Sequence, residues 1–239
     1  MGWDENSTYI LLSEGNGPAD LISIGGNKML DKEGFNLWKE SYDEDVELSE
    51  ETGTYPFAGY SHVLGRVYSL LHACVKPGGN ILDIGFGTGT LTKQLYDEGF
   101  TIFGMDFSDK MVEKAKAKMP GAVLLQHDFA EGLPEVLSGV SFDCILSTYA
   151  IHHLSDTQKV TFIGELLERL SETGKLLIGD VAFSTVKDLE RCRASNQEGW
   201  DEEEFYPVLE RLRPYFSAIE FEKISFCSGV FVFSKESKK

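Results

Sequence analysis

The chain has 239 residues, of which 42% are hydrophobic and 26% charged, as is ordinary for a soluble globular protein. Its 22 basic and 39 acidic residues give a formal net charge of −17. This charge disfavours the phosphates of nucleic acids and anionic lipid surfaces, so we expect neither nucleic acid nor a membrane as a partner. No window is long and apolar enough for a membrane span, and the N-terminus does not resemble a signal peptide.

The cysteines are few and widely spaced, and none forms a C-x-x-C pair; they are Cys74, Cys144, Cys192 and Cys227. This usage predicts free thiols in a reducing compartment, and therefore a cytoplasmic protein.

The length and the pattern of the chain predict one domain with a short addition. Residues 1–34 mix Gly, Asn, Asp and Pro, and we expect them to form an N-terminal extension. Residues 35–239 are expected to form a single α/β domain. Within it, apolar residues recur at helical spacing over 57–75, and Lys76–Pro77–Gly78–Gly79 predicts a turn.

After this turn, short apolar strands alternate with amphipathic helices. We expect strands at 81–84, 101–105, 123–126, 142–147 and 175–181, and helices at 90–96, 108–119 and 156–170. Such an alternation indicates βαβ units with right-handed crossovers and a parallel sheet. Ser155 and Gln158 have the spacing of a capping box, which predicts the start of the third helix.

The last part of the chain departs from this alternation. We expect a helix over 202–212, followed by strands over 218–224 and 227–233, and strands so close in sequence must pair antiparallel. The polar connection over 182–200 fits a lid over a substrate as well as it fits a plain surface connection. The predicted fold is a Rossmann-like, doubly wound, mostly parallel seven-stranded sheet with an antiparallel C-terminal edge hairpin.

A glycine-rich loop with Gly85, Gly87 and Gly89 lies between the first strand and the following helix. A strand, a glycine loop and a helix in this order form a nucleotide-binding crevice, although three glycines alone also fit a tight turn. Thr90 occupies the place of the third glycine in a dinucleotide fingerprint. Asp83 precedes the loop, where a carboxylate suits a ligand with an ammonium and a sulfonium better than a pyrophosphate.

A second acidic residue, Asp106, ends the next strand about twenty residues later. A carboxylate at this place can accept hydrogen bonds from both hydroxyls of a ribose. The same position also suits an Asp that caps the helix beginning at Ser108. The glycine loop upstream favours the ribose.

Several segments resemble the signatures of class I S-adenosylmethionine-dependent methyltransferases. Ile81–Leu91 resembles the first signature and Met105–Ser108 the acidic one, and Gln126–Phe129 is similar to the adenine-binding one. Ser141–Leu154 resembles the fourth strand with its loop, and Asn36–Val46 resembles the N-terminal element that closes over the cofactor. The chain also resembles the YrrT-like group of bacterial methyltransferases over roughly residues 35–235.

The resemblance implies S-adenosylmethionine as the cofactor and assigns roles to individual residues. The cofactor-binding residues that it implies are Asp83, Gly85, Gly87, Asp106, Phe107, Asp128, Phe129 and Ser147. Among them, Asp106 would hold the ribose, and Asp128 with Phe129 the adenine. The residues implied to face the substrate are Tyr60, Tyr149 and His153. Trp38 and Tyr42 would either cover the cofactor or pack a helix on the core.

Two adjacent histidines, His152 and His153, form the remaining candidate group. Adjacent residues on a helix point about 100° apart, so at most one of them is expected to face the pocket. His152 is the candidate general base near neutral pH. No further ligand is spaced for a metal ion, so no metal site is expected.

The predicted function is transfer of a methyl group from S-adenosylmethionine to a small, uncharged or cationic acceptor. That acceptor is expected under a cover made by residues 36–62 and 182–206. Two alternatives remain, a nicotinamide-dependent oxidoreductase and a non-catalytic cofactor-binding domain. A nucleic-acid methyltransferase is disfavoured by the net charge and by Ser147–Ala150, which stands where enzymes acting on base amino groups have an Asn/Asp-Pro-Pro-aromatic run.

Overall fold

The structure is a computed structural model that describes residues 53–235 of the chain. The expected extension over residues 1–34 and the cofactor-closing element with Trp38 and Tyr42 lie outside the described residues.

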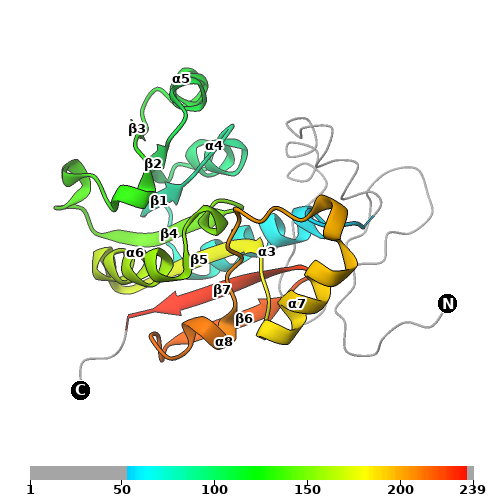
Figure 1. Cartoon of the computed structure of the whole chain (residues 1–239). Helices are drawn as coiled ribbons and strands as arrows, with labels where there is room; N and C mark the ends of the chain where they lie inside the picture. The colour runs from blue at the N-terminus through cyan, green and yellow to red at the C-terminus, as the bar shows by residue number, and fades with distance from the viewer. Residues whose placement is uncertain (1–52, 236–239) are drawn as a thin grey trace, which may run out of the picture.

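Seven strands form one sheet in the order β3-β2-β1-β4-β5-β7-β6 (Figure 1). The strands are β1 Asn80–Ile84, β2 Thr101–Asp106, β3 Val123–Gln126, β4 Phe142–Thr148, β5 Leu170–Val181, β6 Ile219–Lys223 and β7 Ser228–Ser234. The first five strands pair in parallel, and β7 pairs antiparallel with both β5 and β6. The predicted mostly parallel sheet with an antiparallel C-terminal hairpin is therefore confirmed, and β7 is the inner strand of that hairpin.

Helices connect the strands and cover both faces of the sheet. The α-helices are α3 Tyr60–Cys74, α4 Thr90–Asp97, α5 Asp109–Lys118, α6 Asp156–Arg169, α7 Val186–Ser195 and α8 Leu209–Leu212. The short 3₁₀ helices are η1 Phe129–Glu131, η2 Glu135–Leu137, η3 Ile151–His153 and η4 Gln197–Gly199. The predicted capping box starts α6, because Ser155 and Gln158 each accept a hydrogen bond from the other's backbone N–H.

The prediction of a helix over 202–212 is wrong, because only the last turn of that segment, α8, is helical. Pro207 lies in the middle of the expected helix, where it supplies no N–H and disfavours helical geometry at the residue before it. The N–H of Phe205 donates instead to the carbonyl oxygen of His152 over 2.8 Å. The connection over 182–200 is more ordered than expected, since it contains α7, which Thr185 caps.

The apolar core lies in two layers, one on each face of the sheet. Successive residues of a strand point to opposite faces, so Leu176 and Ile178 join one layer and Leu177 joins the other. The first layer packs against α6 and the second against α3, α4 and α5, with α6 and α3 on opposite sides of the sheet in Figure 1. Because both faces are covered, ligands have access at the ends of the strands. None of the helices over residues 53–235 is both long and apolar enough to cross a membrane.

Candidate functional site

The loops that follow β1, β2, β3 and β4 meet at the carboxyl edge of the sheet. The chain runs outward from β1 through β2 to β3 and then returns to β4 on the other side of β1. Such a switch point opens a crevice between the two neighbouring loops. The loop after β1 carries the glycines, and the loop after β4 carries Tyr149 and the two histidines, so the predicted residues converge here.

The glycine loop needs its glycines for two different reasons. Gly85, Gly87 and Gly89 have φ angles of 69°, 55° and 72°, in the left-handed region that favours glycine. A Cβ atom on Gly85 would also lie 2.5 Å from the Cβ of Ala150. A Cβ atom on Gly87 would meet nothing within 4 Å. Gly85 thus allows two loops to pack together, whereas Gly87 leaves room for a ligand beside the backbone.

Asp106 connects the glycine loop to the start of α5. Its Oδ2 accepts a hydrogen bond from the N–H of Gly87 over 2.8 Å, and its Oδ1 accepts one from the N–H of Ser108 over 2.9 Å. The cap of α5 is Ser108 itself, which accepts from the N–H of Met111. The alternative in which Asp106 caps this helix is therefore wrong. Each carboxylate oxygen can accept a second hydrogen bond, so Asp106 retains the capacity to bind ribose hydroxyls.

Asp83 is a buried carboxylate with an incomplete set of partners. The hydroxyl of Thr92 donates to its Oδ2, while its Oδ1 has no hydrogen-bond partner among the described residues. Burial raises the pKa of Asp83 to about 7, with a further contribution from the negative charge of Asp106, while the bond from Thr92 opposes the rise. A carboxylate in this state favours a cationic group next to it.

The residues implied to hold adenine follow β3, and Phe107, another residue implied to bind the cofactor, follows β2. Phe129 is buried and stacks on Phe162 of α6, with ring centroids 5.9 Å apart. Asp128 is exposed, and its Oδ1 accepts a hydrogen bond from the N–H of Ala130 over 2.9 Å. Phe107 is 67% exposed, which is unusual for a large apolar side chain and leaves its ring available to a ligand.

The end of β4 brings together three residues with predicted roles. Ser147 is buried, and its hydroxyl has no hydrogen-bond partner among residues 53–235. Tyr149 has a φ angle of 50°, the one positive value outside glycine in the described chain. Its ring lies against that of Tyr60, with centroids 4.5 Å apart. Tyr60 and Tyr149 therefore form one aromatic wall, and their facing the substrate stays a prediction.

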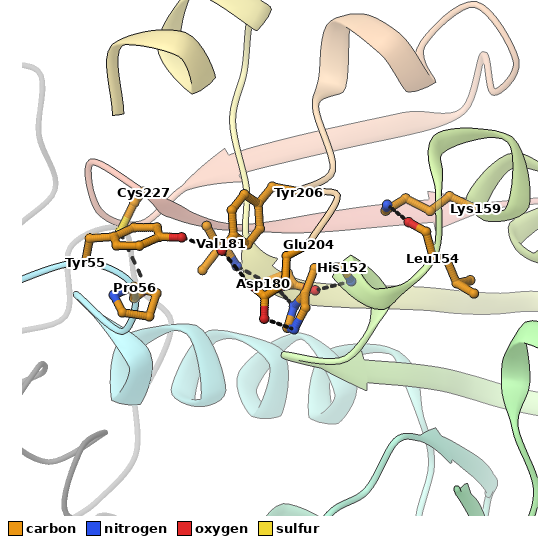
Figure 2. Close-up of polar contacts among 10 residues, drawn as sticks. All are labelled: Tyr55, Pro56, His152, Leu154, Lys159, Asp180, Val181, Glu204, Tyr206 and Cys227. Atoms are coloured by element: carbon orange, nitrogen blue, oxygen red, sulfur yellow. Dashed lines mark hydrogen bonds and ion pairs between the residues drawn. The ribbon is translucent and has the colours of Figure 1, made fainter. Parts of the chain in front are cut away.

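The two histidines occupy different environments on η3. His152 is buried, and its Nδ1 lies 2.7 Å from Oδ1 of Asp180, which is fully buried (Figure 2). Its Nε2 lies 3.5 Å from Oε1 of Glu204. Burial alone lowers the pKa of His152, but the two carboxylates outweigh that effect and raise it. His153 is exposed, and its pKa is lowered by partial burial and by the positive charge of His152.

A chain of polar contacts extends from His152 to the start of the described region (Figure 2). Glu204 accepts a hydrogen bond from the hydroxyl of Tyr206, which is also hydrogen-bonded to that of Tyr55. The ring of Trp200 stacks on Tyr55, with centroids 5.3 Å apart and planes 12° apart. Segments far apart in sequence thus meet over the end of β5.

Reasoning from the sequence missed Asp180 and Glu204. A charged residue inside the apolar run 176–183 is a signal that could have singled out Asp180, because a buried carboxylate needs a partner. Glu204 lies in the acidic run 201–204, and nothing in the sequence distinguishes it from its neighbours.

Known proteins resemble the chain in sequence. Residues 81–174 match the family described as a methyltransferase domain. The chain is 35% identical over 226 residues to an uncharacterized methyltransferase of Geobacillus thermodenitrificans, covering 90% of this chain and 98% of that protein. It is also 32% identical over 195 residues to the uncharacterized methyltransferase YrrT of Bacillus subtilis, covering 78% of this chain and 87% of that protein.

Solved structures resemble the chain in fold. The magnesium protoporphyrin IX methyltransferase of Synechocystis with bound SAH has a TM-score of 0.61 at 17% identity, covering 85% of this chain and 95% of that chain. The DhpI-SAM-HEP complex has a TM-score of 0.57 at 14% identity, covering 86% and 100% of the two chains.

Proposed function

The chain belongs to the YrrT-like family of S-adenosylmethionine-dependent methyltransferases, and we propose that its methyl acceptor is a small molecule bound beside Tyr60 and Tyr149. Membership of this family sets aside the nicotinamide-dependent oxidoreductase. We also propose that residues 35–239 form the methyltransferase domain and residues 1–34 an extension. The cytoplasmic location stays a prediction.

S-adenosylmethionine supplies a methyl group on a positively charged sulfonium. We propose that Gly85 and Gly87 allow its amino-acid end to approach the backbone, with the buried carboxylate of Asp83 close by. Asp106 would hold the ribose through the acceptor capacity that its two backbone bonds leave. The adenine would lie near Asp128, between the exposed ring of Phe107 and the buried ring of Phe129, and Ser147 would face the methionine portion.

The observation that supports a small-molecule acceptor is the contact between the two segments that we expect to form a cover. Tyr55 belongs to the segment 36–62, and Trp200 and Tyr206 belong to the segment 182–206. The ring stack of Tyr55 on Trp200 and its hydrogen bond to Tyr206 join these segments. A joined cover limits the size of the acceptor and excludes water from the sulfonium.

The side chains near the acceptor position favour an uncharged or cationic molecule. Tyr60 and Tyr149 offer aromatic faces, which attract cations, and Asp180 and Glu204 contribute negative charge nearby. Methyl transfer requires in-line positioning of a nucleophile, which such walls provide. The role of His152 as the base stays a prediction, and it requires Glu204 to leave Nε2.

A methyl-transfer screen with isotopically labelled S-adenosylmethionine tests this proposal. The protein is incubated with metabolite fractions and, separately, with total RNA and total DNA. We expect label in a low-molecular-weight product, and less of it with Asp106→Asn as the control, at a concentration of S-adenosylmethionine that does not saturate the variant. Robust labelling of nucleic acid without labelled metabolites would overturn the proposal.

A further inference from the structure

We infer that His152, His153 and Glu204 form a binding site for a divalent transition metal ion of the Zn²⁺ type. One ligand atom from each of these residues lies within 4.8 Å of the other two. Nε2 of His152 and Oε1 of Glu204 are 3.5 Å apart. Two ligands of one zinc ion, each about 2.0–2.2 Å from it, are separated by about that distance in a tetrahedral arrangement.

The imidazole of His152 is held in the orientation that a metal ligand needs. Oδ1 of Asp180 lies 2.7 Å from Nδ1 and also accepts the N–H of Val181 over 2.7 Å. Oδ2 of Asp180 accepts the backbone N–H of His152 over 3.3 Å. With a proton on Nδ1 toward Asp180, the lone pair of Nε2 points toward Glu204. A carboxylate behind a ligating histidine is a common outer partner of metal sites.

The other two ligands are arranged to complete the site. Glu204 uses its second oxygen to accept the hydroxyl of Tyr206, which leaves Oε1 toward His152. The N–H of Phe205 donates to the carbonyl oxygen of His152 and fixes the two backbone segments side by side. The ring centroids of His153 and His152 are 4.3 Å apart, and the exposed His153 already has a ring nitrogen within 4.8 Å of the other two ligand atoms.

The donor set indicates the kind of ion. Two imidazole nitrogens and one carboxylate oxygen favour Zn²⁺, Co²⁺ or Ni²⁺ over Mg²⁺ and Ca²⁺, which prefer oxygen ligands. Three protein ligands leave a coordination position open to water or another small ligand. Reasoning from the sequence expected no metal site because it found no third ligand near the histidines. The fold supplies that ligand from the segment before Pro207.

The protein contains a matched pair without the third ligand. His72 and Glu98 form an ion pair on the surface, with Nε2 and Oε2 2.7 Å apart, but no second imidazole of the described residues joins this pair. A histidine next to a carboxylate is therefore present in both places, and among residues 53–235 only His152, His153 and Glu204 form the complete set. His72→Ala is thus the control for non-specific binding by exposed imidazole.

The test is calorimetric titration of the chelator-treated full chain with Zn²⁺, and with Mg²⁺ for comparison, in the absence of S-adenosylmethionine. We expect one Zn²⁺ per chain and no Mg²⁺ binding. His153→Ala and Glu204→Gln each remove a ligand at a partly or fully exposed position, and they should weaken Zn²⁺ binding at least about tenfold. Asp180→Asn should weaken it about 10–100-fold. His72→Ala should leave it unchanged.

Two results would overturn the inference. The first is that the folded wild-type protein binds no Zn²⁺, or that the His153→Ala and Glu204→Gln variants bind Zn²⁺ as tightly as the wild type does. The second is a Co²⁺ absorption spectrum with thiolate bands, which would place the ion on a cysteine such as Cys74. Both are measured without methyl transfer, so they are independent of the proposed function. Binding of Zn²⁺ at Nε2 would make His152 a ligand and exclude its role as a base.

Discussion

The hydroxyl of Thr92 donates a hydrogen bond over 2.5 Å to Oδ2 of Asp83, inside the contact between α4 and β1. The bond joins the helix after the glycine loop to the strand before it. Asp83 is buried, and its other oxygen has no hydrogen-bond partner in the described part of the chain. The raised pKa of Asp83, about 7 against an ordinary 3.8, makes the stability of the protein depend on pH.

Asp83→Asn is expected to reduce the loss of stability between about pH 4 and about pH 7. Between pH 3.8 and about 7 the folded protein keeps the proton of Asp83 while the unfolded chain loses it. The folded state therefore binds more protons, and stability falls as the pH rises through this window. The asparagine does not titrate, so at the higher pH the variant should have the higher Tm, by about 2–4 °C for each kcal/mol gained.

Thr92→Val is the matched variant for this measurement. The bond from Thr92 lowers the pKa of Asp83, so its loss should extend the fall in stability to a higher pH. Thermal unfolding of all three proteins across this pH range gives the comparison. Equal pH profiles for wild type and Asp83→Asn would show that Asp83 is ionised throughout.

Asp106→Asn is expected to weaken the binding of S-adenosylhomocysteine by about 1.5–3 kcal/mol. An amide has one acceptor oxygen where the carboxylate has two, and the N–H groups of Gly87 and Ser108 already use both. Calorimetry measures the affinity, and thermal unfolding measures the accompanying change in stability. If Tm drops sharply while the affinity stays the same, Asp106 only supports the loop.

Comparing Gly85→Ala with Gly87→Ala distinguishes two roles of the glycine loop, the packing of Gly85 against the neighbouring loop and the access of the ligand to Gly87. Both changes place a side chain at a positive φ angle, but only the new methyl group on Gly85 would meet another side chain, that of Ala150. We expect Gly85→Ala to lose about 1–3 kcal/mol more stability than Gly87→Ala, because it overpacks the contact. Gly87→Ala should stay folded and bind S-adenosylhomocysteine poorly. Chemical denaturation and calorimetry measure the two effects, and similar losses of stability would contradict the assignment.

Trp200→Ala is expected to act on the acceptor and not on the cofactor. It removes the ring that stacks on Tyr55 and contacts Tyr206 edge-on, both of which join the cover. The KM for the acceptor should rise roughly tenfold, in line with about 1–2 kcal/mol for lost aromatic contacts. The Kd of S-adenosylhomocysteine should stay within about twofold. Tyr215→Ala, at an exposed tyrosine in the turn after α8, is the control. An equal loss of cofactor affinity would place Trp200 in the cofactor site.

The sequence predicted most of the sheet because short-range patterns determine it. The spacing of apolar residues, which differs between helices and strands, located six of the seven strands closely. The exception is β5, which begins at Leu170, earlier than expected. The capping box predicted the start of α6 for the same reason, since Ser155 and Gln158 are neighbours. The expected helix over 202–212 failed because Pro207 and a bond to a distant carbonyl outweighed its apolar spacing.

The candidate site was predictable where its residues lie at the carboxyl ends of successive strands. Gly85 and Gly87 follow β1 and Asp106 ends β2, so the order of strands brings them together. The partners of His152 come from the end of β5 and from a segment without regular structure before α8. Their contact depends on tertiary packing over long sequence separations, which no local pattern records.

The position of β7 between β5 and β6 has a consequence for biosynthesis. A chain that leaves the ribosome from its N-terminus can pair β1 to β5 early, but the outer edge of β5 stays open until β7 has emerged. β6 emerges before its partner β7, so it has nothing to pair with in that interval. An open edge recruits strands of other chains. A message truncated before codon 228 would therefore yield an aggregation-prone product, even though it encodes the whole glycine loop.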